Sequence, residues 1–160
     1  MSGWVVEAAG TEGTRQLVER ALARLRDEGR HAIRIVDIDC GTGRRLAGVV
    51  RLARAMGFTA IEARGCAASR EAAHAAAAAS ARHPDAGVGW GFDAVDVAEA
   101  LASEQAEGDA DLILAPRPVA AALLGVSADL VIPIGRRRRD RAAQAGRPQR
   151  RTLICPSAAA

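Results

Sequence analysis

The stretch Val36-Asp37-Ile38-Asp39-Cys40-Gly41-Thr42-Gly43 decides the interpretation of this 160-residue chain. It continues a run rich in β-branched residues that begins at Ile33, and a helical pattern of inward Leu, Val and Ala follows from Arg44 to Met56. Glycines between a strand and a helix permit a tight turn and let a ligand approach the backbone. The stretch therefore predicts a strand–turn–helix unit whose turn faces a ligand.

The same alternation of strand and helix extends in both directions along the chain. We predict helices at 11–28, 44–56, 70–82 (capped by Ser69) and 95–105, a short helix ending at 124, and strands at 33–38, 58–62, 88–92, 111–115 and 129–134. Strands that alternate with helices at this short spacing form right-handed crossovers. The fold class that we expect is α/β: a doubly wound, mostly parallel, Rossmann-like sheet with helices on both faces and a short C-terminal part.

Charge divides the chain into a body and a tail. Residues 1–135, predicted to be one domain, carry 14 arginines and 18 acids, whereas residues 136–160 carry eight arginines and one acid. We expect 136–160 to be a basic, flexible tail with a possible edge strand at 152–155. The run Arg136–Arg151 could contact nucleic-acid phosphates, but only four aromatic residues are available for stacking on bases, so a solvated segment is the favoured interpretation.

Composition excludes several classes of protein. The chain has no lysine, which excludes a Walker A phosphate loop, a Schiff-base enzyme and a protein kinase. Three cysteines far apart suggest neither a disulfide framework nor a metal site, so the cytoplasm is the expected location. No apolar run approaches the roughly 20 residues that span a bilayer, so no membrane partner is expected. The abundance of arginine and alanine indicates a bacterial, GC-rich genome.

Candidate ligand-binding residues follow the first three predicted strands. Ligands bind such sheets at the carboxyl ends of the strands. The first strand ends in the glycine-containing turn, the second is predicted to end at Glu62, and the third ends at Phe92-Asp93. A carboxylate like Glu62 can accept two hydrogen bonds from a ribose diol, and one beside an aromatic ring, like Asp93, can accept an adenine amino group. These three strand ends predict a pocket for an adenosyl group.

Two kinds of nucleotide site use this arrangement. A dinucleotide site needs a third small residue in G-x-G-x-x-G, and Leu46 stands there instead. The stretch Val36–Gly43 resembles the first motif of class I S-adenosylmethionine-dependent methyltransferases, and the order and spacing of Glu62 and Asp93 are similar to that family's ribose and adenine acids. The resemblance covers residues 11–134.

The resemblance implies a role for each of these residues. Asp37 would orient the amino group of the methionine moiety, and Gly41 and Gly43 would line the methionine and ribose. Glu62 would bind the ribose hydroxyls and Asp93 the adenine. Asp39 stands where the family usually has its first glycine, so a carboxylate faces the bound cofactor at a position that is normally bare backbone.

The expected function is therefore S-adenosylmethionine-dependent methyl transfer to an unidentified acceptor. No catalytic acid or base is visible, and the reaction needs none, because positioning the acceptor for an in-line displacement and excluding water can supply much of the catalysis. The alternative is a non-catalytic nucleotide-binding or partner-binding module that has kept the fold and lost methyl transfer. Asp39 and the short C-terminal part favour that alternative.

Overall fold

The computed structural model describes residues 12–107, 110–116 and 131–134. They form a five-stranded sheet in the order β3-β2-β1-β4-β5, in which every neighbouring pair is parallel. The strands are β1 (Ala32–Ile38), β2 (Ala60–Ala67), β3 (Val88–Ala94), β4 (Leu112–Pro116) and β5 (Val131–Ile134). The helices are α1 (Glu12–Asp27), α2 (Arg44–Ala55), α3 (Arg70–Ala81) and α4 (Val97–Glu107).

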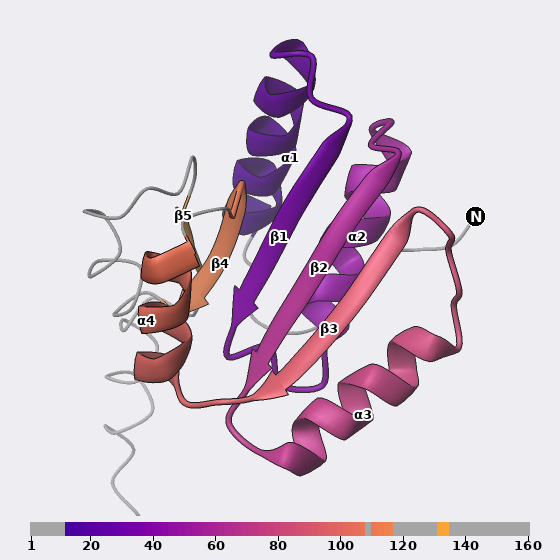
Figure 1. Cartoon of the computed structure of the whole chain (residues 1–160). Helices are drawn as coiled ribbons and strands as arrows, with labels where there is room; N and C mark the ends of the chain where they lie inside the picture. Colours follow the sequence, from indigo (N-terminus) through magenta and orange to yellow (C-terminus); the bar gives the residue numbers. More distant parts are fainter. Residues whose placement is uncertain (1–11, 108–109, 117–130, 135–160) are drawn as a thin grey trace, which may run out of the picture.

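Helices cover both faces of this sheet, as predicted (Figure 1). On one face, α1 and α2 pack against β1, β2 and β4 through a core that includes Leu22, Leu46 and Ile35. On the opposite face, α4 packs against β1 and β4 around Val36 and Ile113. The strands of a parallel sheet that are covered on both sides read as continuous apolar runs, and β4 is buried along nearly its whole length. The predicted doubly wound α/β class is therefore confirmed.

The order of the strands locates the binding edge. From β1 the chain proceeds outward through β2 to β3, then returns to the other side of β1 and continues through β4 to β5. The strand order thus reverses between β1 and β4, and a doubly wound sheet opens a crevice at the carboxyl ends of its strands at such a switch point. The turn that follows β1 lies at this position.

Local signals set most element boundaries. The Ser69 side chain accepts a hydrogen bond from the Ala72 backbone N–H at 3.2 Å, so the predicted helix cap is confirmed. Gly29, just beyond the end of α1, has φ +81°, which is accessible to glycine without strain. Strand β5, which contains Pro133, lies at one edge of the described sheet, where proline is tolerated. The predicted short helix ending at 124, the tail 136–160 and the edge strand 152–155 lie outside the described residues, and the 1–135 domain boundary stays a prediction.

The end of β2 was predicted wrongly. The strand does not stop at Glu62 but continues through Ala67, and its register pairs Glu62 with Arg34 near the start of β1 and Cys66 with Ile38 at the end of β1. The residues after Glu62 have weak strand propensity. They are held in the strand because β1 pairs with β2 on one side and β3 pairs with it on the other. Glu62 consequently lies toward the amino end of the sheet.

Candidate functional site

The turn after β1 has the backbone of a glycine-rich loop at three alternating positions. Asp39, Gly41 and Gly43 have φ values of +67°, +55° and +74°, and Asp39 is the only described residue other than glycine with positive φ. The Cys40 N–H donates to the Cys66 carbonyl at 2.8 Å, and the Gly43 N–H donates to the Cys40 carbonyl at 3.0 Å. The first bond ties the turn to the end of β2, and the second closes the turn just before α2 begins at Arg44.

The turn is packed tightly on its inner side. A Cβ added to Gly43 would lie 3.0 Å from the Ala76 Cβ and 3.2 Å from an edge carbon of Phe92. A Cβ on Gly65, at the end of β2, would lie 2.7 Å from Phe92 and 2.9 Å from the Cys40 Sγ. Gly65 was not among the predicted site residues, because nothing in the sequence places it beneath this turn. By contrast, a Cβ on Gly41 would meet no described atom within 4 Å, so the space next to Gly41 is accessible.

Asp37 is completely buried at the end of β1 and is held by one arginine. Its Oδ1 accepts from the Arg45 Nη2 at 2.5 Å and its Oδ2 from the Arg45 Nε at 3.1 Å. Burial raises the pKa of Asp37 to about 6, an effect that the Arg45 charge opposes but does not cancel. Arg45 is one-third exposed, and its Nη2 also donates to the Asp39 carbonyl at 3.0 Å. The charged group that reaches the surface here is therefore a guanidinium.

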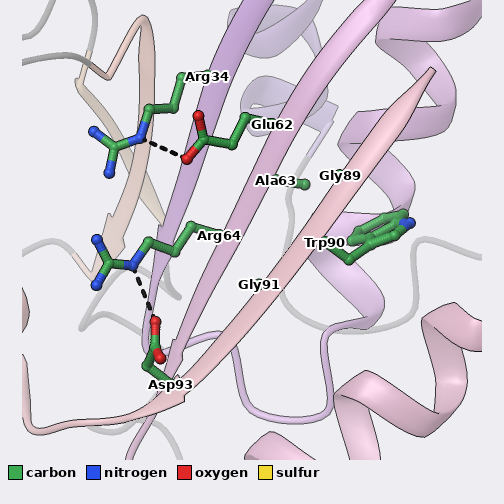
Figure 2. A pocket seen from close by; sticks show the side chains of 8 residues that line it. All are labelled: Arg34, Glu62, Ala63, Arg64, Gly89, Trp90, Gly91 and Asp93. Atoms are coloured by element: carbon green, nitrogen blue, oxygen red, sulfur yellow. Dashed lines mark hydrogen bonds and ion pairs between the residues drawn. The ribbon is translucent and has the colours of Figure 1, made fainter. Parts of the chain in front are cut away.

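Asp93 lies at the carboxyl edge of the sheet, as expected. It is the penultimate residue of β3 and is level with Cys66, which is in turn level with Ile38 beside the turn. Its carboxylate accepts from the Arg64 Nε at 3.0 Å and is about half exposed (Figure 2). The structure thus brings Asp93 and the turn to one edge.

Glu62 is not part of this edge. It lies four residues before Cys66 along β2, which corresponds to about 13 Å at the rise of a β-strand. Its Oε1 accepts from the Arg34 Nε at 3.2 Å (Figure 2). The predicted position of Glu62 at the end of β2 is therefore wrong, because β2 is longer than its sequence pattern indicated, and this position does not favour the predicted ribose contact.

Glu62 and Asp93 instead border a hollow on the face of the sheet (Figure 2). This hollow, of about 410 Å³, is lined by Arg34, Glu62, Ala63, Arg64, Gly89, Trp90, Gly91 and Asp93. Glu104 of α4, almost fully buried, lies 3.3 Å from Arg34 and 3.7 Å from Arg64. Glu62, Arg34, Glu104, Arg64 and Asp93 thus form a row of alternating acids and arginines. This row fixes the orientation of Arg64, which pairs with Asp93.

The carboxyl end of β2 carries no carboxylate. Its last residues, Cys66 and Ala67, are buried. Burial raises the pKa of Cys40 to about 12 and that of Cys66 to about 11, so both thiols stay protonated near neutral pH and are poor nucleophiles. The described residues contain no cluster of His, Cys, Asp or Glu that could hold a metal ion. Within those residues, every helix is too short or too polar to traverse a lipid bilayer.

Comparison with known proteins shows a similarity of fold but no match in sequence. No protein-family model matches the chain, and no curated protein does. Among solved structures, the chain resembles the plantazolicin methyltransferase BpumL in complex with a pentazolic desmethylPZN analogue and SAH, with a TM-score of 0.51 and 16% identity over 88% of this chain and 54% of that one.

Two further matches are more distant. The putative protein-L-isoaspartate O-methyltransferase of Plasmodium falciparum matches with a TM-score of 0.43 and 14% identity, over 71% of this chain and 52% of that one. The magnesium protoporphyrin IX methyltransferase of Synechocystis matches with a TM-score of 0.44 and 20% identity, over 74% and 52%. The chain spans about half the length of these structures. At 16% identity, the match to BpumL with a TM-score of 0.51 shows a methyltransferase-like fold.

Proposed function

We propose that this chain binds S-adenosylmethionine at the carboxyl edge of its sheet and transfers the methyl group to an acceptor that is still to be identified. The observation that carries the proposal is the turn Asp39–Gly43, whose three positive φ angles lie at the point where the strand order reverses. A turn of this kind at a switch point exposes backbone to a ligand. The methyltransferase-like fold supports the same assignment.

The residues of this edge fit an adenosyl ligand in part. Gly41 offers accessible backbone beside the turn, and the half-exposed carboxylate of Asp93 can accept a hydrogen bond from an adenine amino group. Asp37, Asp39, Gly41, Gly43 and Asp93 form the proposed binding set. Glu62 is left out of it because of its distance from the edge.

The chemistry that S-adenosylmethionine supplies is a methyl group on a sulfonium, whose departure leaves a neutral thioether. The protein then has to bind the adenosyl part, align the acceptor and exclude water. The buried, protonated thiols of Cys40 and Cys66 are not suited to act as relay nucleophiles. We therefore assign no catalytic residue, and the acceptor, whether a small molecule or a macromolecule, is expected to supply the nucleophile.

Calorimetric titration of the full chain with S-adenosylmethionine, S-adenosylhomocysteine and NAD tests the proposal. We expect both adenosyl compounds to bind and NAD not to bind. Asp93→Ala should weaken both by about tenfold, the effect of removing one charge-assisted hydrogen bond, and Glu62→Ala should leave both unchanged. A folded chain that binds neither adenosyl compound would overturn the proposal. Binding without methyl transfer to any acceptor would favour the non-catalytic alternative.

We further propose that the protein works in a bacterial cytoplasm. Two observations support this location: Cys40 and Cys66 are free and buried, and the basic residues are all arginine in an alanine-rich chain. A nucleic-acid acceptor reached through Arg136–Arg151 is not favoured. If such an acceptor were used, binding to DNA or RNA would weaken steeply with added salt.

A further inference from the structure

In the ion pair of Asp37 and Arg45 beside the turn, the carboxylate is buried and the guanidinium reaches the surface. Asp37 has no exposed surface, and both of its oxygens are engaged by Arg45 at 2.5 and 3.1 Å. A ligand ammonium group could reach this carboxylate only by displacing the guanidinium from a bidentate pair. Breaking such a buried pair is costly, because it leaves an uncompensated charge in the interior.

Arg45, in contrast, is accessible without any displacement. Its side chain is one-third exposed at the first turn of α2, beside the Asp39–Gly43 turn. Asp37 holds Nε and Nη2, and Nη2 also donates to the Asp39 carbonyl. Nη1 has no hydrogen-bond partner among the residues that the structure describes. A guanidinium fixed along one edge in this way is preorganised to bind an anion with the rest of its donors.

We propose that Arg45 is the specificity-determining residue of the adenosyl site, which binds the carboxylate of the ligand's amino-acid end, and that Asp37 is the positioning residue that holds Arg45. This inference rests on the proposed function and revises the role that the family resemblance implies for Asp37. Asp37 holds the Arg45 guanidinium in place, and the positively charged guanidinium is the group that contacts the ligand.

S-adenosylmethionine carries both an ammonium and a carboxylate at its amino-acid end. If Arg45 binds the carboxylate, a ligand without it binds weakly, whereas if Asp37 binds the ammonium, the same ligand keeps its affinity. Decarboxylated S-adenosylmethionine keeps the ammonium but has no carboxylate. 5′-Methylthioadenosine lacks both groups and keeps the adenosine and the thioether. Titration calorimetry of the full chain with these two compounds and S-adenosylmethionine therefore separates the end group from the adenosine.

We expect the wild type to bind S-adenosylmethionine about tenfold or more tightly than its decarboxylated form, as expected for the loss of one charge-assisted contact. Arg45→Lys keeps the charge but not the bidentate fork and should reduce this preference. The double variant Asp37→Leu/Arg45→Met replaces the ion pair by apolar groups, which proteins often tolerate. It should abolish the preference and leave the affinity for 5′-methylthioadenosine within about twofold.

Arg44→Met is the matched control. Arg44 is an exposed arginine one residue away on the same helix turn, and Asp37 does not bind it. Removing it deletes a guanidinium from the same helix turn and lowers the net charge by one, a larger change than either Arg45 variant makes, and should still preserve the carboxylate preference. Equal binding of both S-adenosylmethionine forms by the wild type, or a preference that survives in the double variant, would overturn the role of Arg45. Failure of all three compounds to bind the folded wild type would instead overturn the proposed function.

Discussion

Asp39 occupies a backbone conformation that glycine adopts more readily than any other residue. Its φ of +67° matches those of Gly41 and Gly43 in the same turn, and its side chain is exposed. Left-handed backbone costs most residues with a Cβ about 1 kcal/mol or more, and aspartate is one of the few that adopt it with any frequency. The turn therefore keeps the geometry of three glycines while it presents one additional carboxylate.

We predict that Asp39→Gly raises the free energy of unfolding by up to about 1 kcal/mol. Glycine makes the unfolded chain more flexible, which opposes this gain, but the relief of left-handed strain outweighs that loss at a positive φ. Urea unfolding, with the slope of the transition held in common, measures the difference.

Asp39→Ala is the control for this prediction. Alanine has no polar group to stabilise the left-handed conformation and should lower the free energy of unfolding relative to the wild type. If the glycine variant were less stable than the wild type, the Asp39 carboxylate would have to stabilise the turn by more than the backbone strain costs.

At the scale of elements, the sequence predicted the helices and strands well where periodicity and capping were strong. Helices α1, α2 and α3 were predicted to within about two residues at each end. Strand β2 was predicted to end five residues early, because Arg64 and Gly65 have little strand propensity and are kept in the sheet by pairing on both sides, after which Ala67 pairs with Ala94 of β3. That single error misplaced Glu62, whereas Asp93 and the turn after β1 were correctly placed at the carboxyl edge.

The ion pairs of the site could not have been predicted. Nothing in the one-dimensional pattern shows that Arg45 turns back toward Asp37, eight residues earlier, or that Arg64 lies beside Asp93. Both contacts depend on helix packing and strand register, which a propensity analysis does not contain. The charge of a candidate site is therefore a result of the tertiary structure, and here each of these two acids is balanced by an arginine.

Gly65 connects strand β2 to the turn and to β3. An added methyl group would lie 2.7 Å from Phe92 and 2.9 Å from the Cys40 Sγ, closer than real Cβ contacts. We predict that Gly65→Ala lowers the free energy of unfolding by about 1–3 kcal/mol, the usual cost of overpacking. Thermal and urea unfolding measure it.

Gly91→Ala is the matched control, because Gly91 also lies within the sheet, in β3, and a Cβ there would meet no described atom within 4 Å. This variant should differ little from the wild type. The double variant Gly65→Ala/Phe92→Leu should recover part of the lost stability. An equal loss in both single variants would show that the loss of glycine itself, rather than contact with Phe92, is responsible.

At the scale of the whole molecule, the buried acid makes stability depend on pH. The pKa of Asp37 is about 6 in the folded chain, and in the unfolded chain the group has its ordinary pKa of 3.8. Between these values the folded state retains a proton that the unfolded state has released. The stabilisation from this group is therefore complete below about pH 4 and is lost as the pH rises through 6.

We predict that the stability of Asp37→Asn, relative to the wild type, rises by roughly 2–3 kcal/mol between pH 4 and pH 7. The variant has no titrating group at this position, whereas Asp37 must ionise beside Asp39 and against its burial, helped only by Arg45. Urea unfolding of both proteins at intervals of half a pH unit measures the change. Parallel curves for the two proteins would contradict a raised pKa.

The packing of β3 has an optical consequence. Trp90 is stacked on Phe92 with ring centroids 6.1 Å apart, and Phe92 in turn lies against Gly43 and Gly65. The chain has only one other indole, at Trp4, so a Trp4→Phe background leaves Trp90 as the sole tryptophan. Its emission then originates three residues before Asp93 and next to the Phe92 ring that lies against the turn, so the molecule contains its own fluorescent reporter of events at the turn.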